Sequence, residues 1–157
     1  MNWDVIVQYL PRLLDGALLT LQLVAISVLA GLILALPMGI ARASQNFYVR
    51  ALPYAYIFFF RGTPLLVQLF LVYYGMAQFE VVRKSALWPY LRDPYWCAII
   101  TMTLHTAAYI AEIIRGAIQA VPPGEVEAAR ALGMSRTQTL LHVTLPRAIR
   151  IGLPAYS

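Results

Sequence analysis

The sequence from Gly16 to Ala41, GALLTLQLVAISVLAGLILALPMGIA, contains 26 residues and no ionisable side chain. A helix needs about 20 mainly apolar residues to cross a hydrocarbon core of roughly 30 Å. The stretch is longer than the apolar core of a secretory signal peptide, and residues 1–4 place no Lys or Arg ahead of it. It therefore predicts a transmembrane helix that is not removed as a signal peptide.

The composition of the whole chain agrees with a membrane protein. Of its 157 residues, 61% are hydrophobic and 12% are charged, whereas about 25% are charged in a typical soluble domain. So few charged side chains argue against a soluble enzyme and a disordered regulator. A nucleic-acid-binding domain is also disfavoured, since the 12 Lys and Arg residues behind the net charge of +5 do not gather on one polar face. Cys97 is the single cysteine, so no internal disulfide or cysteine-based zinc site can form. We expect an all-α, multi-pass membrane protein with no nucleic-acid partner.

Two further spans follow from the gaps between charged residues. Residues 51–79 are mainly apolar and Arg61 is their only charged residue, and residues 94–111 contain no Asp, Glu, Lys or Arg ahead of Glu112. Gly62 and Pro64 predict a break near Arg61, because proline lacks a backbone donor, and residues 51–60 then form a lead-in to the main part of the span. We expect one transmembrane domain, residues 1–157, with spans at about 16–41, 51–79 and 94–115, a cytoplasmic loop at about 121–146 and part of a fourth span from 147.

Lysine and arginine residues predict the orientation of these spans. With the N-terminus outside the cell, seven of them lie in the inner connections and four in the outer ones, and the reversed orientation exchanges these numbers. The N-terminus is therefore expected outside.

The segment after the third span has a different character: VPPGEVEAARALGMSRTQTLLHVTLPRAIR, residues 121–150. Pro123 can open a helix and Gly133 can end it in a left-handed conformation. Ser135 and Gln138 have the spacing of a capping box, which predicts a second short helix at about 136–143, with Pro146 just past its end. The sequence thus predicts two short, rigid helices that meet at a glycine on the cytoplasmic face, where a partner could touch them.

The same segment carries a recognisable signature. Glu127-Ala128-Ala129, three residues, Gly133, nine residues and then Val143-Thr144-Leu145-Pro146 resembles the EAA signature of ABC importer permeases, with Val143 in place of the usual isoleucine. Residues 60–64 (FRGTP), 108–113 (AYIAEI) and 153–157 (LPAYS) are similar to the polar amino acid permeases, most of all to M-type subunits of histidine/lysine/arginine/ornithine and opine importers. The resemblance covers nearly the whole chain.

This resemblance implies a permease subunit of a type I importer in the bacterial inner membrane. It implies transport of polar, basic amino acids into the cytoplasm, without a cofactor and without catalysis by this chain, because ATP hydrolysis takes place in a separate subunit. The implied partners are an ABC ATPase dimer, a second permease subunit that is identical or related, an extracytoplasmic solute-binding protein, the amino acid and the lipid bilayer. Family members continue through a completed fourth span and a fifth, so the chain is expected to be C-terminally truncated.

The EAA signature also implies which residues couple to the ATPase. They are Glu127, Ala128, Ala129, Gly133, Leu145 and Pro146. For Glu127 two interpretations stay open, since its carboxylate can bind the partner or stabilise the start of its own helix.

A second group of residues is a candidate for the substrate path or for pairing within the bundle. It consists of Arg61, Gly62, Thr63, Pro64, His105, Tyr109 and Glu112. An arginine inside a membrane is costly unless it is paired or near water, and Glu112 could be its ion-pair partner, or both could meet the charged groups of a passing amino acid. His105, Tyr109 and Glu112 are spaced to share one helix face. On that face His105 can be a hydrogen-bonded packing residue or a residue that takes part in function. Residues 62–64 can form a simple kink or a broken helix that lines a cavity.

Two other classes of function make different demands on the sequence. A stand-alone secondary transporter or channel would need no cytoplasmic partner, so it would work without the 125–143 loop. A membrane-embedded enzyme would need paired acids or a histidine cluster within the spans, where only His105 and Glu112 qualify. The chain has no phosphate-binding P-loop motif and no second His or Cys at metal-ligand spacing, so neither a bound nucleotide nor a metal is expected.

Overall fold

The computed structural model describes the backbone of residues 3–156 and the side chains of residues 8–153. This part of the chain is helical and contains no strand, which confirms the all-α prediction. The helices are α1 (Trp3–Arg42), α2 (Phe47–Gly62), α3 (Leu65–Phe70), α4 (Glu80–Arg83), α5 (Trp88–Leu91), α6 (Pro94–Gln119), α7 (Pro123–Ala131), α8 (Arg136–Thr139) and α9 (Leu145–Tyr156). A π turn at Leu71–Gly75 and a 3₁₀ turn at Met76–Gln78 extend α3.

Two helices are each long and apolar enough to cross a membrane, α1 over Gln8–Arg42 and α6 over Pro94–Gln119. The second predicted span is divided, because α2 and the segment Leu65–Gln78 pass this test only together and meet at an angle of 105°. The break predicted near Gly62 and Pro64 is therefore a sharp bend. A single span at 51–79 stays a prediction.

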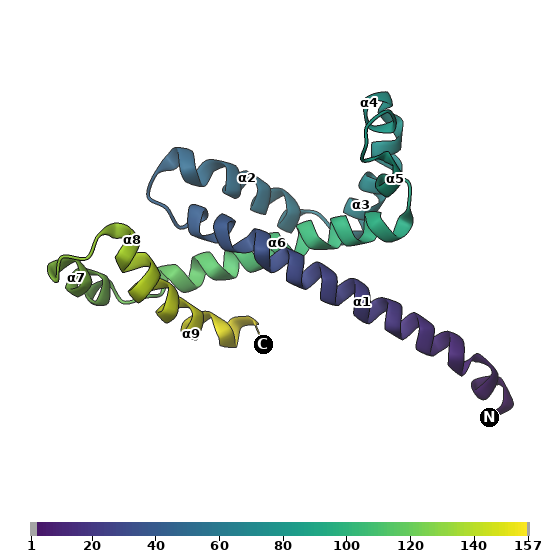
Figure 1. Cartoon of the computed structure of the whole chain (residues 1–157), viewed down its shortest axis with the longest axis horizontal. Helices are drawn as coiled ribbons and strands as arrows, with labels where there is room; N and C mark the ends of the chain where they lie inside the picture. Colours follow the sequence, from purple (N-terminus) through teal and green to yellow (C-terminus); the bar gives the residue numbers. More distant parts are fainter. Residues whose placement is uncertain (1–2, 157) are drawn as a thin grey trace.

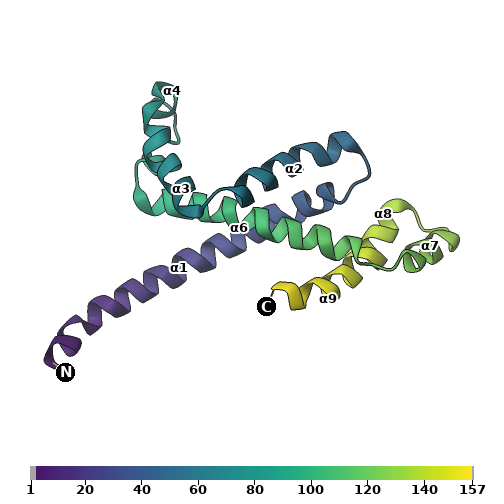
Figure 2. The same ribbon diagram turned by 180° about the vertical axis from the view of Figure 1, so that it is seen from behind.

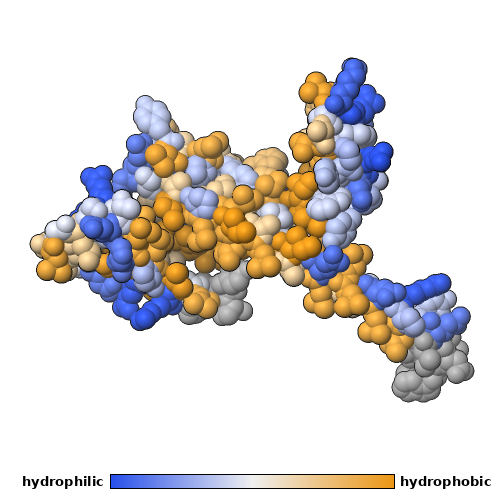
Figure 3. Space-filling view, in the orientation of Figure 1, coloured by the Kyte–Doolittle hydropathy of each residue, from blue (hydrophilic) through white to orange (hydrophobic). Residues whose placement is uncertain are grey.

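Helices α1 and α6 cross at the centre of the molecule, with α2 beside them and α9 on another side (Figures 1 and 2). The first half of α1 extends away from this crossing. Helices α3 to α5 lie at one end of α6, and α7 and α8 lie at its other end. Apolar side chains cover the crossing helices, whereas hydrophilic ones gather over α7–α8 and at the tip of α4 (Figure 3). This distribution is typical of a bundle whose middle lies in lipid.

Small residues let α1 and α6 approach closely. On α1 they recur at every fourth position and form a stripe of Ser27, Gly31, Ala35 and Gly39. A Cβ atom added to Gly39 would lie 2.8 Å from the Ile114 side chain and 2.9 Å from the Ala111 backbone oxygen. Ala107 and Ala111 of α6 are fully buried. Close backbone contact of this kind is a main source of helix association in membranes, where lipid is as apolar as the side chains.

The connection into α9 corrects one prediction from the sequence. Pro146 was expected just past a short helix ending near residue 143, but α8 ends at Thr139 and leads through a π turn at Leu140–Thr144 directly into α9. The Leu145 amide bonds the Leu140 oxygen in this wider turn. Pro146 then occupies the first turn of α9, where the lack of a proline N–H costs little.

Candidate functional site

The break between α2 and α3 exposes backbone polar groups inside an apolar segment. Thr63 and Pro64 have extended conformations, with ψ of 139° at both residues. Proline has no N–H to continue the helix, and it drives the residue before it out of the helical region. The carbonyl groups that precede the break therefore lose their partners in the helix and need others.

Gln68, a residue that the sequence interpretation missed, supplies those partners. It is buried on α3, and its Nε2 lies 2.9 Å from the Phe60 oxygen and 3.0 Å from the Thr63 oxygen. The Thr63 hydroxyl accepts from the same nitrogen at 2.6 Å and donates to the Phe59 oxygen at 2.9 Å. A glutamine four residues after an X-Pro break was the available signal, since one turn of helix brings its amide back over the break.

His105 connects this break to α6. Its Nδ1 lies 3.1 Å from Gln68 Oε1. Because an amide oxygen only accepts, Nδ1 carries the proton in this contact. The imidazole ring also packs on the ring of Tyr109, with 4.8 Å between the centroids. His105 and Tyr109 thus lie together on the side of α6 that meets the broken helix.

The charged residues form a cluster one turn further along α6. Arg61 lies over the Tyr109 ring, 5.4 Å from its centroid, and its Nη1 is 3.9 Å from Glu112 Oε1. Arg115 is much closer to the same carboxylate oxygen, at 2.6 Å through Nη2 and 2.8 Å through Nε. Glu112 is therefore balanced mainly by Arg115. The i, i+3 spacing of the two residues was a signal for this pair that the sequence interpretation did not use.

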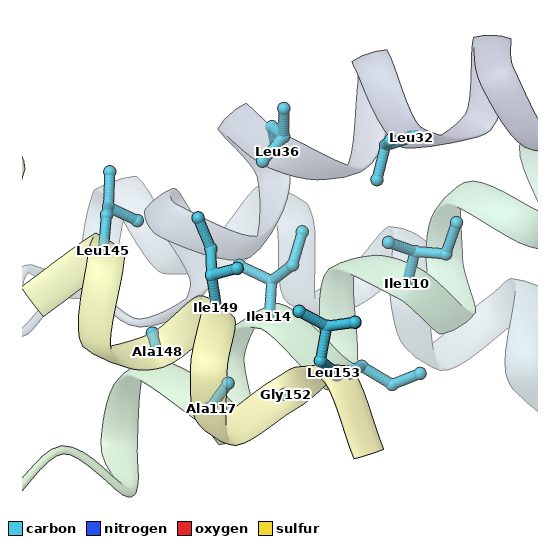
Figure 4. A pocket seen from close by; sticks show the side chains of 11 residues that line it. Leu32, Leu36, Ile110, Ile114, Ala117, Leu145, Ala148, Ile149, Gly152 and Leu153 are labelled. Carbon is cyan, nitrogen blue, oxygen red and sulfur yellow. The ribbon is translucent and has the colours of Figure 1, made fainter. Parts of the chain in front are cut away.

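A separate pocket has no polar lining. It has a volume of about 250 Å³ and lies between α1, α6 and α9, with Leu36, Ile114 and Leu153 among the side chains that point into it (Figure 4). A charged or zwitterionic solute would lose its hydration here without a replacement. The polar chemistry of the bundle therefore lies at the break and along the face of α6 that carries His105.

Helices α7 and α8 form a rigid elbow, which we define as residues 123–139. Gly133 has the left-handed φ of +84° that the sequence predicted. Its amide donates to the Arg130 oxygen at 2.9 Å and the Met134 amide to the Ala129 oxygen at 3.1 Å, the two bonds of a Schellman motif. The predicted capping box of Ser135 and Gln138 is also present.

The elbow is joined to the rest of the protein on two sides. Glu125 Oε1 lies 3.2 Å from Arg147 Nε on α9. A cavity of about 540 Å³ is lined by both the α1–α2 turn, residues 43–46, and residues of the elbow such as Arg130 and Arg136. The turn and the elbow therefore lie at the same end of the bundle.

The predicted coupling residues differ in their exposure. Glu127, Ala128, Gly133 and Pro146 are exposed, Leu145 is half-buried, and Ala129 is buried inside the elbow. No cation of residues 8–153 lies within ion-pair distance of the Glu127 carboxylate. Leu132 is 83% exposed beside Gly133, a feature that the sequence interpretation did not single out. A free carboxylate and a bare leucine at the tip of a rigid elbow form a surface that another protein could bind.

Comparison with known proteins identifies the family. Residues 27–155 match the model of the family described as binding-protein-dependent transport system inner membrane component. The chain belongs to this family. The two groups of residues that the sequence predicted border different cavities, since residues of the elbow line one and Arg61, Gly62 and Glu112 line another.

Several permeases are similar over most of this chain. The octopine transport system permease protein OccM of Rhizobium radiobacter is 49% identical over 96% of the chain, which covers 61% of that relative. The nopaline permease protein NocM of Agrobacterium fabrum is 46% identical over 99% of the chain and 65% of the relative. The histidine/lysine/arginine/ornithine permease protein HisM of Escherichia coli is 44% identical over 90% and 60%. The chain thus spans about three fifths of the length of these relatives.

A solved structure shows the same fold. It is described as the crystal structure of an amino acid ABC transporter with histidines, and it matches 99% of this chain and 68% of that chain with a TM-score of 0.81 at 34% identity. The helical permease bundle predicted from the sequence is thereby confirmed.

Proposed function

We propose that this permease is the transmembrane subunit of an ATP-binding cassette importer that moves polar, basic amino acids into the cytoplasm. Relatives named for histidine, lysine, arginine, ornithine and opine transport support this substrate class. The chain works with an ATPase dimer, a second permease subunit, identical or related, and an extracytoplasmic binding protein. Its N-terminus lies outside, and the elbow lies on the cytoplasmic side.

The elbow is the observation that carries this proposal. Its two helices are fixed at Gly133 by the Schellman motif and at Ser135 by the capping box, so a force applied at the tip is transmitted without local unfolding. Leu132 and Glu127 are free to dock with the ATPase, and this use of Glu127 is favoured over a role in its own helix because the carboxylate is exposed and unpaired within the described part of the chain. Closure of the ATPase on ATP would then draw the elbow along and open the outer side to the amino acid, and hydrolysis would reset it.

The path for the amino acid is assigned to the broken helix. Gly62, Thr63 and Pro64 supply irregular backbone, and His105 and Tyr109 face them from α6. Backbone carbonyls and a histidine can replace part of the hydration of a polar solute. Glu112 is assigned to pairing within the bundle, because Arg115 balances its carboxylate at 2.6 Å and Arg61 is only a distant second partner at 3.9 Å.

A glycine pair within the elbow tests the proposed coupling. Gly133→Ala places a side chain at a φ of +84°, which strains the elbow by about 1–2 kcal/mol, whereas a Cβ added at Gly124 meets nothing within 4 Å. In proteoliposomes with the ATPase and binding protein, ATP-dependent arginine uptake should fall several-fold for Gly133→Ala and stay near the wild-type rate for Gly124→Ala.

The alternative, a stand-alone secondary transporter or channel, predicts a different result. Uptake would then continue without ATP, and both glycine variants would transport at the wild-type rate. Either outcome would exclude coupling through the elbow.

A further inference from the structure

A second polar cavity lies between α1, α2 and α6 and shares only Gly62 with the proposed path. It has a volume of about 260 Å³. Its lining consists of Arg42, Tyr54, Ile57, Phe58, Arg61, Gly62 and Glu112. Two arginines and one carboxylate thus share a space bordered by aromatic and aliphatic side chains.

Arg42 has no partner for its charge among the described side chains. Its guanidinium lies over the ring of Tyr54, 4.7 Å from the centroid, and its Nε is buried without a hydrogen-bond acceptor. No carboxylate of residues 8–153 lies within 4.0 Å of it. A buried guanidinium N–H without an acceptor is costly, so the position requires an acceptor that this part of the chain does not provide.

The carboxylate in the cavity does not cancel this excess. Glu112 is held by Arg115 at 2.6 Å, while Arg61 is 3.9 Å away from it. Two arginines, Arg42 and Arg61, line the cavity, and its one carboxylate, Glu112, is already neutralised by Arg115. The site therefore carries a surplus of positive charge. Within a membrane bundle such a surplus favours binding of an anion.

The place of the cavity indicates what kind of anion it takes. Arg42 is in the last turn of α1, and the polar turn 43–46 follows it directly, so this end of the cavity lies where the helix leaves the apolar layer. Tyr54 and Phe58 are 50% and 70% exposed and present aromatic surface beside the opening. Basic pockets between helices at the cytoplasmic end of a bundle are typical sites for anionic lipid headgroups.

We propose that this cavity binds the phosphodiester of an anionic phospholipid, with Arg42 and Arg61 as the phosphate ligands. The phosphate oxygens accept from the free Arg42 Nε–H, and the glycerol and acyl chains follow the exposed faces of Tyr54 and Phe58. The bound lipid holds the end of α1 against α2. This inference depends on the membrane location of the chain and on the proposed orientation, with the end of α1 on the cytoplasmic side, and not on transport or on the ATPase.

The experiment measures how much lipid the protein retains. The protein is extracted from its membrane with detergent and purified together with the subunits it assembles with there. After delipidation, dioleoyl-phosphatidylglycerol or dioleoyl-phosphatidylcholine is titrated in, and native mass spectrometry counts the lipid retained. Phosphatidylglycerol should be retained over phosphatidylcholine, and Arg42→Gln should weaken its retention about fivefold. Arg50→Gln is the matched control, because Arg50 lies over Phe47 near the same end of the bundle but outside the cavity, and it should change retention less than twofold.

Three results would overturn the proposal. These are equal retention of the two lipids, equal losses for Arg42→Gln and Arg50→Gln, and displacement of the lipid by a soluble molecule at millimolar concentration. Displacement by inorganic phosphate would assign the site to a soluble anion, and displacement by free histidine would assign it to an amino acid. If Arg42→Gln does not assemble, Arg42→Lys and Arg61→Gln provide the test. The first should retain part of the preference for phosphatidylglycerol and the second should lower it, and wild-type retention by Arg61→Gln would contradict the assignment.

Discussion

Three glycines of α1 predict a graded response to the addition of one methyl group. A Cβ at Gly16 meets nothing within 4 Å. At Gly31 it would lie 3.3 Å from backbone atoms of α6, and at Gly39 it would lie 2.8 Å from Ile114 and 2.9 Å from a backbone oxygen. Substitution by alanine should therefore be harmless at Gly16 and most damaging at Gly39.

The size of each effect follows from two opposing terms. Alanine is a better helix former than glycine by about 1 kcal/mol. Forcing an extra methyl group into a packed interface costs about 1–3 kcal/mol, and at Gly39 the contact with a backbone oxygen leaves only a shift of the whole helix as relief. We expect Gly16→Ala to be neutral or stabilising by up to about 1 kcal/mol and Gly31→Ala to be near neutral. Gly39→Ala, whose contacts under 3.0 Å take the upper part of that cost, about 2–3 kcal/mol, should lose about 1–2 kcal/mol net.

The free energy of unfolding can be measured by titration of the purified protein with sodium dodecyl sulfate, followed by circular dichroism. Gly16→Ala is the internal control, since it tests helix propensity on the same helix without the contact. If Gly39→Ala is as stable as Gly16→Ala, then α1 and α6 do not pack through the stripe of small residues, and the account of the central crossing is wrong.

Two further substitutions test the polar contacts. Gln68→Leu leaves the carbonyls at the helix break without donors, at a cost of about 1–3 kcal/mol each. Amide hydrogen exchange in the residues after the break should then accelerate. Gln8→Leu, on the exposed end of α1, is the control and should leave this exchange rate unchanged. Arg115→Gln removes the short partner of Glu112 and should destabilise the bundle more than Arg61→Gln, which removes only a 3.9 Å contact. Equal losses of thermal stability for the two arginine variants would contradict this ranking.

The sequence predicted features that depend on local chemistry. Long gaps between charges marked α1 and α6, because an apolar helix of that length is stable in lipid whatever its neighbours are. The left-handed Gly133 and the capping box at Ser135 were predictable because each involves residues within one or two turns. The position of Pro146 inside α9 was not predictable. It depends on the π turn at Leu140–Thr144, which continues the helix and carries no capping residue that the sequence would show.

Contacts between helices were harder to predict. The sequence interpretation offered Glu112 as a partner of Arg61, and the two lie 3.9 Å apart. Their distance depends on how α2 is rotated about its axis where it packs on α6, and no local pattern sets that rotation. The shorter Arg115–Glu112 pair was predictable from its i, i+3 spacing, whereas the sequence interpretation considered only Arg61 as a partner of Glu112. Gln68 was overlooked because a lone amide in an apolar run has no meaning until the 105° break shows which carbonyls it faces.

The arrangement of α6 explains how an event at the elbow could reach the path. Only Ala120, Val121 and Pro122 separate the end of α6 from α7, and the pair of Glu125 and Arg147 ties α7 to α9, which itself packs on α6. We therefore expect a displacement of the elbow to move α6 along with it. Because α6 also contacts the broken helix through His105 and Gln68, the proposed coupling predicts that this movement changes the geometry of the break, whereas a flexible connection would absorb it.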